Sequence, residues 1–140
     1  MRLVLASDEK LPVVAHVAAL LRARGHEVDE LPTAPWGEAA LGVARQVGSG
    51  RAEQGVVLCY TGTGVSIAAN KVKGVRAALC VDRETAAGAR KWNDANVLAL
   101  SLRLCTPAIA DTILDAWLTT PYDGSEEPSL EAIRREEEEP

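Results

Sequence analysis

The residues best suited to chemistry lie in one short stretch, Cys59-Tyr60-Thr61-Gly62-Thr63-Gly64. An apolar run precedes this stretch and a run of small residues follows it, a pattern that predicts a buried strand, a glycine turn and a helix. Glycines let backbone N–H groups converge on one point, and a helix adds the positive end of its dipole. The turn therefore favours an anion such as a phosphate or an enediolate oxygen.

Cys59 ends the predicted strand immediately before the turn. A thiol there faces the anion site, and as a thiolate it could abstract a carbon-bound proton. Cys80 and Cys105 lack such a position and are interpreted as small buried apolar residues. The spacing of the three cysteines fits neither a disulfide framework nor a metal site, so none is expected.

The glycine pair also has a plainer interpretation, in which Gly62 and Gly64 only permit a tight connection between strand and helix. The spacing matches neither the phosphate loop that ends in Gly-Lys-Ser/Thr nor the dinucleotide fingerprint, whose third glycine would fall at Ile67. The pattern by itself leaves both interpretations open.

The composition is that of an ordinary globular domain, with 47% hydrophobic and 25% charged residues. Acidic groups are concentrated in residues 123–140, and the net charge of the whole chain is −5. No apolar run is long enough for a membrane span, and no basic face with aromatic residues is evident, so neither membrane nor nucleic acid is an expected partner. The first residues read as a core strand rather than a secretory peptide, which favours a cytoplasmic location.

Short apolar runs alternate with longer amphipathic stretches, a pattern typical of strand–helix units around a parallel sheet. We expect an α/β fold: a single doubly wound domain in residues 1–122, with a five-stranded parallel sheet flanked by helices. Residues 123–140 form an acidic C-terminal tail, expected to be a short helix or disordered. The predicted strands are Arg2–Ala6, Glu27–Leu31, Gly55–Tyr60, Arg76–Val81 and Val97–Leu100. The predicted helices are Leu11–Arg24, Gly37–Val47, one beginning near Gly64, Arg83–Trp92 and Thr106–Thr119.

Ligands of such folds bind beyond the carboxyl ends of the strands. This rule singles out residues 7–10, 59–66 and 81–83 as the neighbourhood of a site.

The segment from Val65 to Cys80 resembles the ribose-5-phosphate isomerase type B and galactose-6-phosphate isomerase family almost residue for residue. Further similarity lies at Ser7-Asp8, in residues 25–28 and 93–98, and at Arg103, so the likeness extends over residues 1 to about 124. The resemblance implies an aldose–ketose isomerase that acts on a small sugar phosphate without metal ion or organic cofactor. It also implies a homodimer, or a tetramer, with active sites at the subunit interface.

The resemblance further implies a role for individual residues. Cys59 would move a proton between C1 and C2 through an enediolate, and backbone N–H groups of residues 61–66 would stabilise the oxyanion by a preorganised arrangement. Arg103 would meet the phosphate as a bidentate cation. The catalytic set is Cys59 and Thr61, and the substrate-binding set is Asp8, Glu9, Tyr60, Gly62, Thr63, Gly64, Ser66, Trp92, Asn93 and Arg103, with no metal ligand.

Four departures from the family pattern surround this set. Glu9 stands where the family has a histidine, and Trp92 replaces the histidine that opens the sugar ring. Residues 124–128 replace a phosphate-binding segment, and Tyr60 replaces a glycine of the loop. A carboxylate beside a phosphate dianion is repelled by roughly a kcal/mol at contact range, and an indole cannot titrate.

Three functions are compatible with this pattern. The first is an active isomerase with altered specificity, and the second is an inactive homologue that serves as a small-anion or sugar-binding protein or as a partner subunit. The third is a glycine-loop domain that binds another small anion, for example a nucleotide fragment, because a fold alone does not fix a function.

Overall fold

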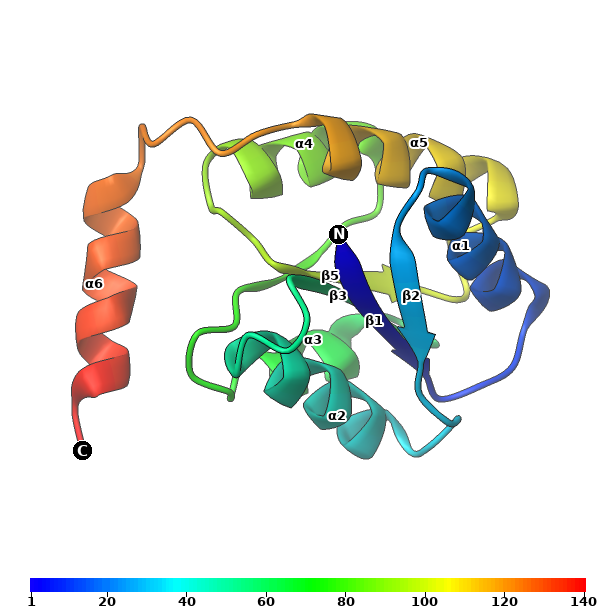
Figure 1. Ribbon diagram of the computed structural model, residues 1–140, viewed down its shortest axis with the longest axis horizontal. Coiled ribbons are helices and arrows are strands. Elements are labelled where there is room, and N and C mark those ends of the chain that lie inside the picture. The colour runs from blue at the N-terminus through cyan, green and yellow to red at the C-terminus, as the bar shows by residue number, and fades with distance from the viewer.

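A five-stranded parallel sheet forms the centre of the protein, with the strand order β2-β1-β3-β5-β4 (Figure 1). The structure is a computed structural model that describes residues 1–140. The predicted α/β fold is confirmed, and the predicted bounds differ from the observed ones by one or two residues. The elements are β1 (Arg2–Ser7), α1 (Pro12–Ala23), β2 (Glu27–Glu30), α2 (Trp36–Gly48), β3 (Gln54–Cys59), α3 (Thr63–Ala69), β4 (Ala77–Leu79), α4 (Arg83–Lys91), β5 (Val97–Ser101), α5 (Pro107–Thr119) and α6 (Glu127–Glu138).

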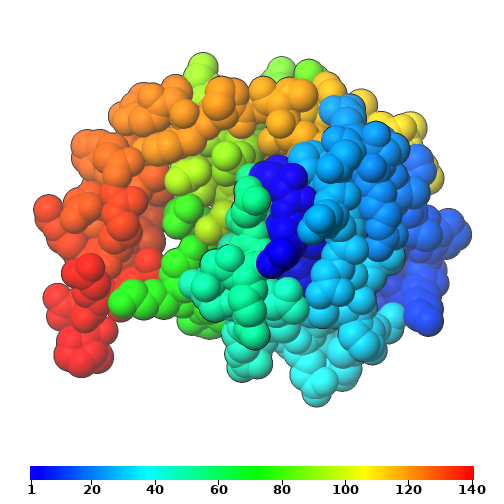
Figure 2. All heavy atoms as spheres, viewed as in Figure 1, coloured from blue at the N-terminus to red at the C-terminus, as the bar shows by residue number.

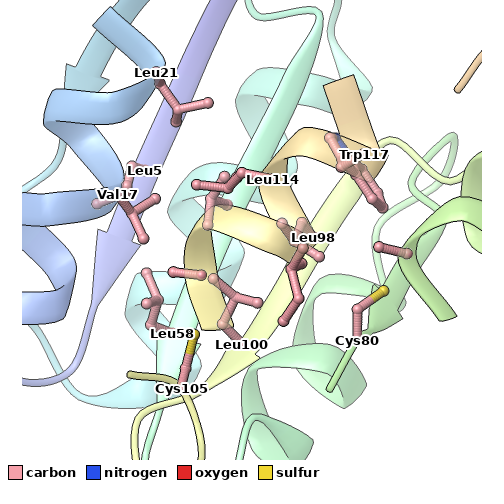
Figure 3. Close-up of a cluster of buried hydrophobic side chains, with 14 of the residues drawn as sticks. Leu5, Val17, Leu21, Leu58, Cys80, Leu98, Leu100, Cys105, Leu114 and Trp117 are labelled. Atoms are coloured by element: carbon pink, nitrogen blue, oxygen red, sulfur yellow. The ribbon is translucent and has the colours of Figure 1, made fainter. Parts of the chain in front are cut away.

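Alternation along the strands divides the apolar residues between two cores. In β1, Leu3 and Leu5 belong to the core under α1, α4 and α5, whereas Val4 and Ala6 belong to the core over α2 and α3. This division follows from the two-residue period of a strand, which turns successive side chains to opposite faces. Figure 3 shows the first core, where leucines of the central strands meet those of the helices.

The core against α2 and α3 is built from smaller side chains, mainly alanine and valine. Close approach of α2 to the sheet depends on Gly55, because a Cβ there would lie 2.4 Å from Cγ1 of Val43. Real Cβ contacts are never that short, so this helix packs almost directly on the strand backbone. Cys59 belongs to this small-residue face of the sheet.

The chain reverses direction across the sheet between β1 and β3. From β1 it passes through α1 to the edge strand β2, and it then returns through α2 to β3 on the other side of β1. The helices that follow β1 and β3 therefore lie on opposite faces of the sheet (Figure 1). Such a switch point opens a crevice at the carboxyl ends of the two strands, which is where ligands bind in doubly wound sheets.

The acidic tail contains a helix, α6, which stands beside the sheet (Figure 1). Leu130 is its one buried residue, at 4% exposure, and Glu137 accepts a hydrogen bond of 2.6 Å from the Gly74 amide. Figure 2 shows a hollow between α6 and the segment that leads into β4. None of the helices, α6 included, has the length and apolar character that crossing a membrane requires.

Candidate active site

A cavity of about 310 Å³ opens at the carboxyl ends of β1 and β3. It is at the switch point, so residues that follow two non-consecutive strands meet there. Asp8 comes from the end of β1 and Cys59 from the end of β3, followed by residues of the glycine turn. The lining residues are Asp8, Trp36, Cys59, Tyr60, Thr61, Thr63 and Gly64.

Cys59 is the only thiol at this cavity. It is 5% exposed, and its carbonyl accepts a 2.9 Å hydrogen bond from the Leu102 amide, which fixes the end of the strand. Cys80 and Cys105 lie in the opposite core, as expected for structural residues. Burial, with Asp82 as a second cause, raises the pKa of Cys80 to about 12, and burial also raises the pKa of Cys105. Both of these thiols are held in their unreactive protonated form.

The glycine turn leaves backbone donors free. Gly62 has a φ of 79°, and a Cβ on it would lie 2.5 Å from Cδ1 of Leu79 and 3.1 Å from the backbone at Leu100 and Ser101. Any other residue would have to displace the Leu79 side chain and adopt a left-handed φ that L side chains rarely take. The amides of Thr61 and Gly62 donate to no acceptor within the chain, and the first-turn amides of α3 have no intrahelical partner. These groups are available to an anion.

Asp8 carries a buried oxygen with no hydrogen-bond partner, Oδ1. Its own amide donates to the Leu58 carbonyl at 3.2 Å, which ties the end of β1 to β3. Leaving a buried polar atom unpaired costs roughly 1–3 kcal/mol, so such atoms are rare in native proteins. Asp8 supplies the only carboxylate among the residues that line the cavity.

Trp36 is a lining residue that the sequence did not reveal. It begins α2 and is 50% exposed, and a Cβ added to Gly64 would lie 2.8 Å from its ring atom Cε3. The available signal was an aromatic residue after Pro35, at the start of a helix. That signal is informative only once α2 is known to cover the face that Cys59 points to, and this depends on the strand order.

Four of the predicted site residues do not line this cavity: Glu9, Gly62, Ser66 and Arg103. Glu9 is exposed beside Asp8, with its backbone held by the Ser7 hydroxyl at 2.8 and 3.2 Å. Ser66 lies further along α3, and its amide donates to the Gly62 carbonyl at 3.2 Å, so the prediction that this amide serves the oxyanion site is wrong. The Arg103 amide donates to the Tyr60 carbonyl at 3.0 Å, and its exposed guanidinium has no ion-pair partner in the chain. The side-chain roles of Glu9, Ser66 and Arg103 in substrate binding stay predictions. Gly62 shapes the turn, and its part in substrate binding also stays a prediction.

Trp92 and Asn93 line a different cavity. It has a volume of about 610 Å³ and lies between the segment that follows α4 and helix α6. The chain by itself therefore does not bring these two side chains to Cys59. Their proposed contacts with substrate stay predictions that require a second copy of the chain.

Known proteins resemble this chain in both sequence and structure. The Ribose/Galactose Isomerase family matches residues 3–133. The chain is 38% identical over 120 residues to D-erythrulose-4-phosphate isomerase of Pectobacterium atrosepticum, covering 81% of this chain and 79% of that protein. It is 46% identical over 85 residues to the putative sugar phosphate isomerase YwlF of Bacillus subtilis, covering 61% of this chain but only 57% of that protein.

The likeness extends to solved structures. Ribose-5-phosphate isomerase B of Clostridium thermocellum superposes with a TM-score of 0.93 at 35% sequence identity, covering 98% of this chain and 97% of that one. The chain belongs to the ribose/galactose isomerase family.

Proposed function

We propose that the protein is an aldose–ketose isomerase that acts on a small sugar phosphate through proton transfer by Cys59. The observation that carries this proposal is the convergence of three groups at one cavity: the Cys59 thiol, the Asp8 carboxylate and the free amides of the glycine turn. A base, a hydroxyl acceptor and an oxyanion site are the groups that an enediolate mechanism needs.

In this mechanism Cys59 takes the proton from the carbon next to the carbonyl and returns it to the neighbouring carbon. Negative charge develops on the carbonyl oxygen, and the amides of Thr61 and Gly62, together with those in the first turn of α3, would receive it. Preorganised donors of this kind supply about 3–4 kcal/mol of transition-state stabilisation each. Asp8 would hold a sugar hydroxyl, because it supplies the only carboxylate that lines the cavity.

Names of related proteins support a phosphorylated substrate. The matched relatives are named as isomerases of erythrulose 4-phosphate and of ribose 5-phosphate. Arg103 is the proposed phosphate ligand, since its guanidinium has no ion pair and its backbone adjoins Tyr60. The specificity would be altered relative to ribose 5-phosphate isomerases, because Glu9 and Trp92 change the charge and proton donors that the resemblance implies.

The proposed assembly is a homodimer in which the second chain completes each site. Support comes from the position of Asn93, which lines a cavity other than that of Cys59 within one chain. A contribution from the partner would bring such a residue to the substrate.

A second candidate is an inactive homologue that binds a sugar or a small anion. It is favoured by the absence of any basic side chain among the residues that line the cavity within one chain. This candidate predicts ligand binding without turnover.

Solvent exchange tests the two candidates against each other. The protein is incubated in D2O with a panel of phosphorylated and neutral aldoses, and deuterium at C2 is followed by NMR. The proposed isomerase incorporates deuterium into at least one sugar, and Cys59→Ala abolishes the incorporation while circular dichroism remains unchanged. Cys105→Ala, which removes a thiol from the opposite core, is the matched control and retains exchange. An absence of exchange with every sugar contradicts the isomerase.

A further inference from the structure

Two aromatic side chains frame the cavity that contains Cys59. Trp36 is 50% exposed and Tyr60 is 64% exposed, and both line the cavity. The indole of Trp36 is packed against Gly64 at a distance that leaves no room for a Cβ. The Tyr60 carbonyl accepts hydrogen bonds from the Ser101 hydroxyl at 2.9 Å and the Arg103 amide at 3.0 Å. The backbone under Tyr60 is therefore fixed, and both aromatic residues border the cavity.

The cavity contains no imidazole and no amine. Its polar side chains are one carboxylate, one thiol, one phenol, two threonine hydroxyls and the indole of Trp36. Both histidines of the chain are engaged elsewhere: His16 Nε2 lies 2.6 Å from Asp111, and His26 Nδ1 lies 2.9 Å from the N-terminal amine. Trp92 is no substitute, because an indole does not exchange protons near neutral pH. Neither histidine of the chain is therefore placed to protonate a sugar ring oxygen in this cavity.

A ring oxygen must be protonated only where a ring exists. An aldose closes its five-membered ring through the oxygen on C4, and opening that ring requires a general acid. In an aldotetrose 4-phosphate the C4 oxygen carries the phosphoryl group, so this ring cannot form. Such a sugar presents its carbonyl directly to the enzyme, and it is also shorter by one carbon than a pentose phosphate.

We infer, on the basis of the proposed isomerase function, that the substrate is an open-chain four-carbon sugar phosphate whose length is selected by Tyr60 and Trp36. The reaction interconverts an aldotetrose 4-phosphate and its 2-ketose. Cys59 breaks the C2–H bond of the aldose, the electron pair forms the C1–C2 double bond, and the C1 oxygen gains negative charge. The proton returns to C1 and the proton on O2 passes to O1. C1 is reduced and C2 is oxidised, so no external oxidant or reductant takes part.

Rates for sugar phosphates of different length test this inference. The full-length protein is assayed with D-erythrose 4-phosphate, D-ribose 5-phosphate and D-galactose 6-phosphate, and kcat/KM for isomerisation is measured. We expect the four-carbon substrate to be favoured by about a hundredfold or more, the size of a missing general acid. An equal or higher kcat/KM for either longer aldose overturns the inference and leaves the proposed isomerase standing. If none of the three exchanges deuterium, the proposed function itself fails.

Two open-chain ketoses separate length from ring opening. D-Ribulose 5-phosphate has its C5 oxygen esterified and so forms no five-membered ring, which makes it a longer match for D-erythrulose 4-phosphate. Deuterium exchange at C1 is expected to be slower for the five-carbon ketose. Tyr60→Gly should raise its rate relative to the four-carbon ketose by about tenfold or more, whereas Tyr60→Phe, which keeps the ring, should preserve the original preference. An unchanged ratio in Tyr60→Gly would exclude Tyr60 as the residue that selects length.

Discussion

Gly25 and Gly62 both have positive φ angles, 87° and 79°, but their surroundings differ. Gly25 follows α1 with no atom within 4 Å of an added Cβ, whereas a Cβ on Gly62 would collide with Leu79 and with the backbone of β5. The first glycine is required only by its backbone conformation. The second is required by conformation and by space, which is how the turn is held against the end of the neighbouring strand.

Replacing these glycines by alanine should therefore have unequal effects. Gly25→Ala is expected to lower the free energy of unfolding by about 1–2 kcal/mol, the cost of a left-handed alanine. Gly62→Ala adds an overpacking cost of about 1–3 kcal/mol and displaces the amides of the turn. Urea unfolding of both variants measures the difference. Equal losses in the two variants would contradict the packing seen at Gly62.

Replacing Asp8 by asparagine is expected to stabilise the fold and to reduce activity. The buried Oδ1 of Asp8 has no hydrogen-bond partner in the free protein. An asparagine amide is uncharged, so it removes the free-energy cost of burying part of the carboxylate charge. Asp8→Asn should raise the free energy of unfolding by roughly 1 kcal/mol and lower kcat/KM. Thermal unfolding and the isomerase assay measure the two effects. Asp29→Asn, at an exposed position in β2, is the control and should change neither. A less stable Asp8→Asn protein would argue against an unpaired carboxylate.

At the scale of elements, the first residue of α6 makes two polar contacts. The Tyr122 hydroxyl donates to Glu127 just ahead of the helix, and Arg134 donates to the other oxygen of the same carboxylate. The hydrogen bonds from Tyr122 and Arg134 lower the pKa of Glu127 below its ordinary value of 4.5. The hydrogen bond to Glu127 raises the pKa of Tyr122 to about 12.

These opposite shifts define a pH window for the contact. A lowered carboxyl pKa stabilises the contact above the ordinary glutamate range, and this stability is lost as the pH falls through the lowered value. A raised phenol pKa stabilises it below pH 10, and this stability is lost as the pH rises towards 12. The contact is therefore strongest around neutral pH.

The variant Tyr122→Phe tests this window. At pH 7 it should reduce the amide-exchange protection factors of residues 127–138 relative to the unchanged protein. The difference between the two proteins should shrink well below pH 4.5, where the unchanged protein also loses the contact. Protection of the central strand β3 serves as the internal control and should not differ between them. A difference that is constant between pH 7 and pH 3 would show that the hydroxyl does not hold the helix through Glu127.

At the scale of the whole molecule, two cavities lie in different parts of one chain. Cys59 and Asp8 line the cavity at the switch point, whereas Trp92 and Asn93 line the cavity beside α6. A two-fold dimer would allow each chain to contribute one of these groups to the same site, since every contact in such an interface occurs twice.

Mixing inactive variants tests the proposed dimer. Cys59→Ala and Asn93→Ala chains are unfolded, mixed in equal amounts and refolded together. If the two residues serve one site from different chains, half of the dimers are mixed and contain one intact site, so about a quarter of the activity returns. Each variant refolded alone is the control. An absence of recovery, with dimers present by sedimentation, would place Asn93 outside the shared site.

The sequence by itself determined the strands, the helices and the glycine turn. Apolar runs, Gly25 and Pro107 mark local preferences that need no distant partner, so the predicted bounds agree with the structure within one or two residues. The position of Cys59 next to the turn could be predicted in the same way, because it depends only on neighbouring residues in the sequence. The tail remained open between helix and disorder, because Leu130 supplies the only buried contact of α6.

Only the tertiary structure decided which groups share the cavity. The strand order sets β1 beside β3, and strand alternation turns Cys59 to the face that α2 covers, which brings in Trp36. The same order sends Trp92 and Asn93 to another cavity. The residues next to these side chains in the sequence do not show which of them share a cavity, because the face that a helix covers depends on where its flanking strands pair.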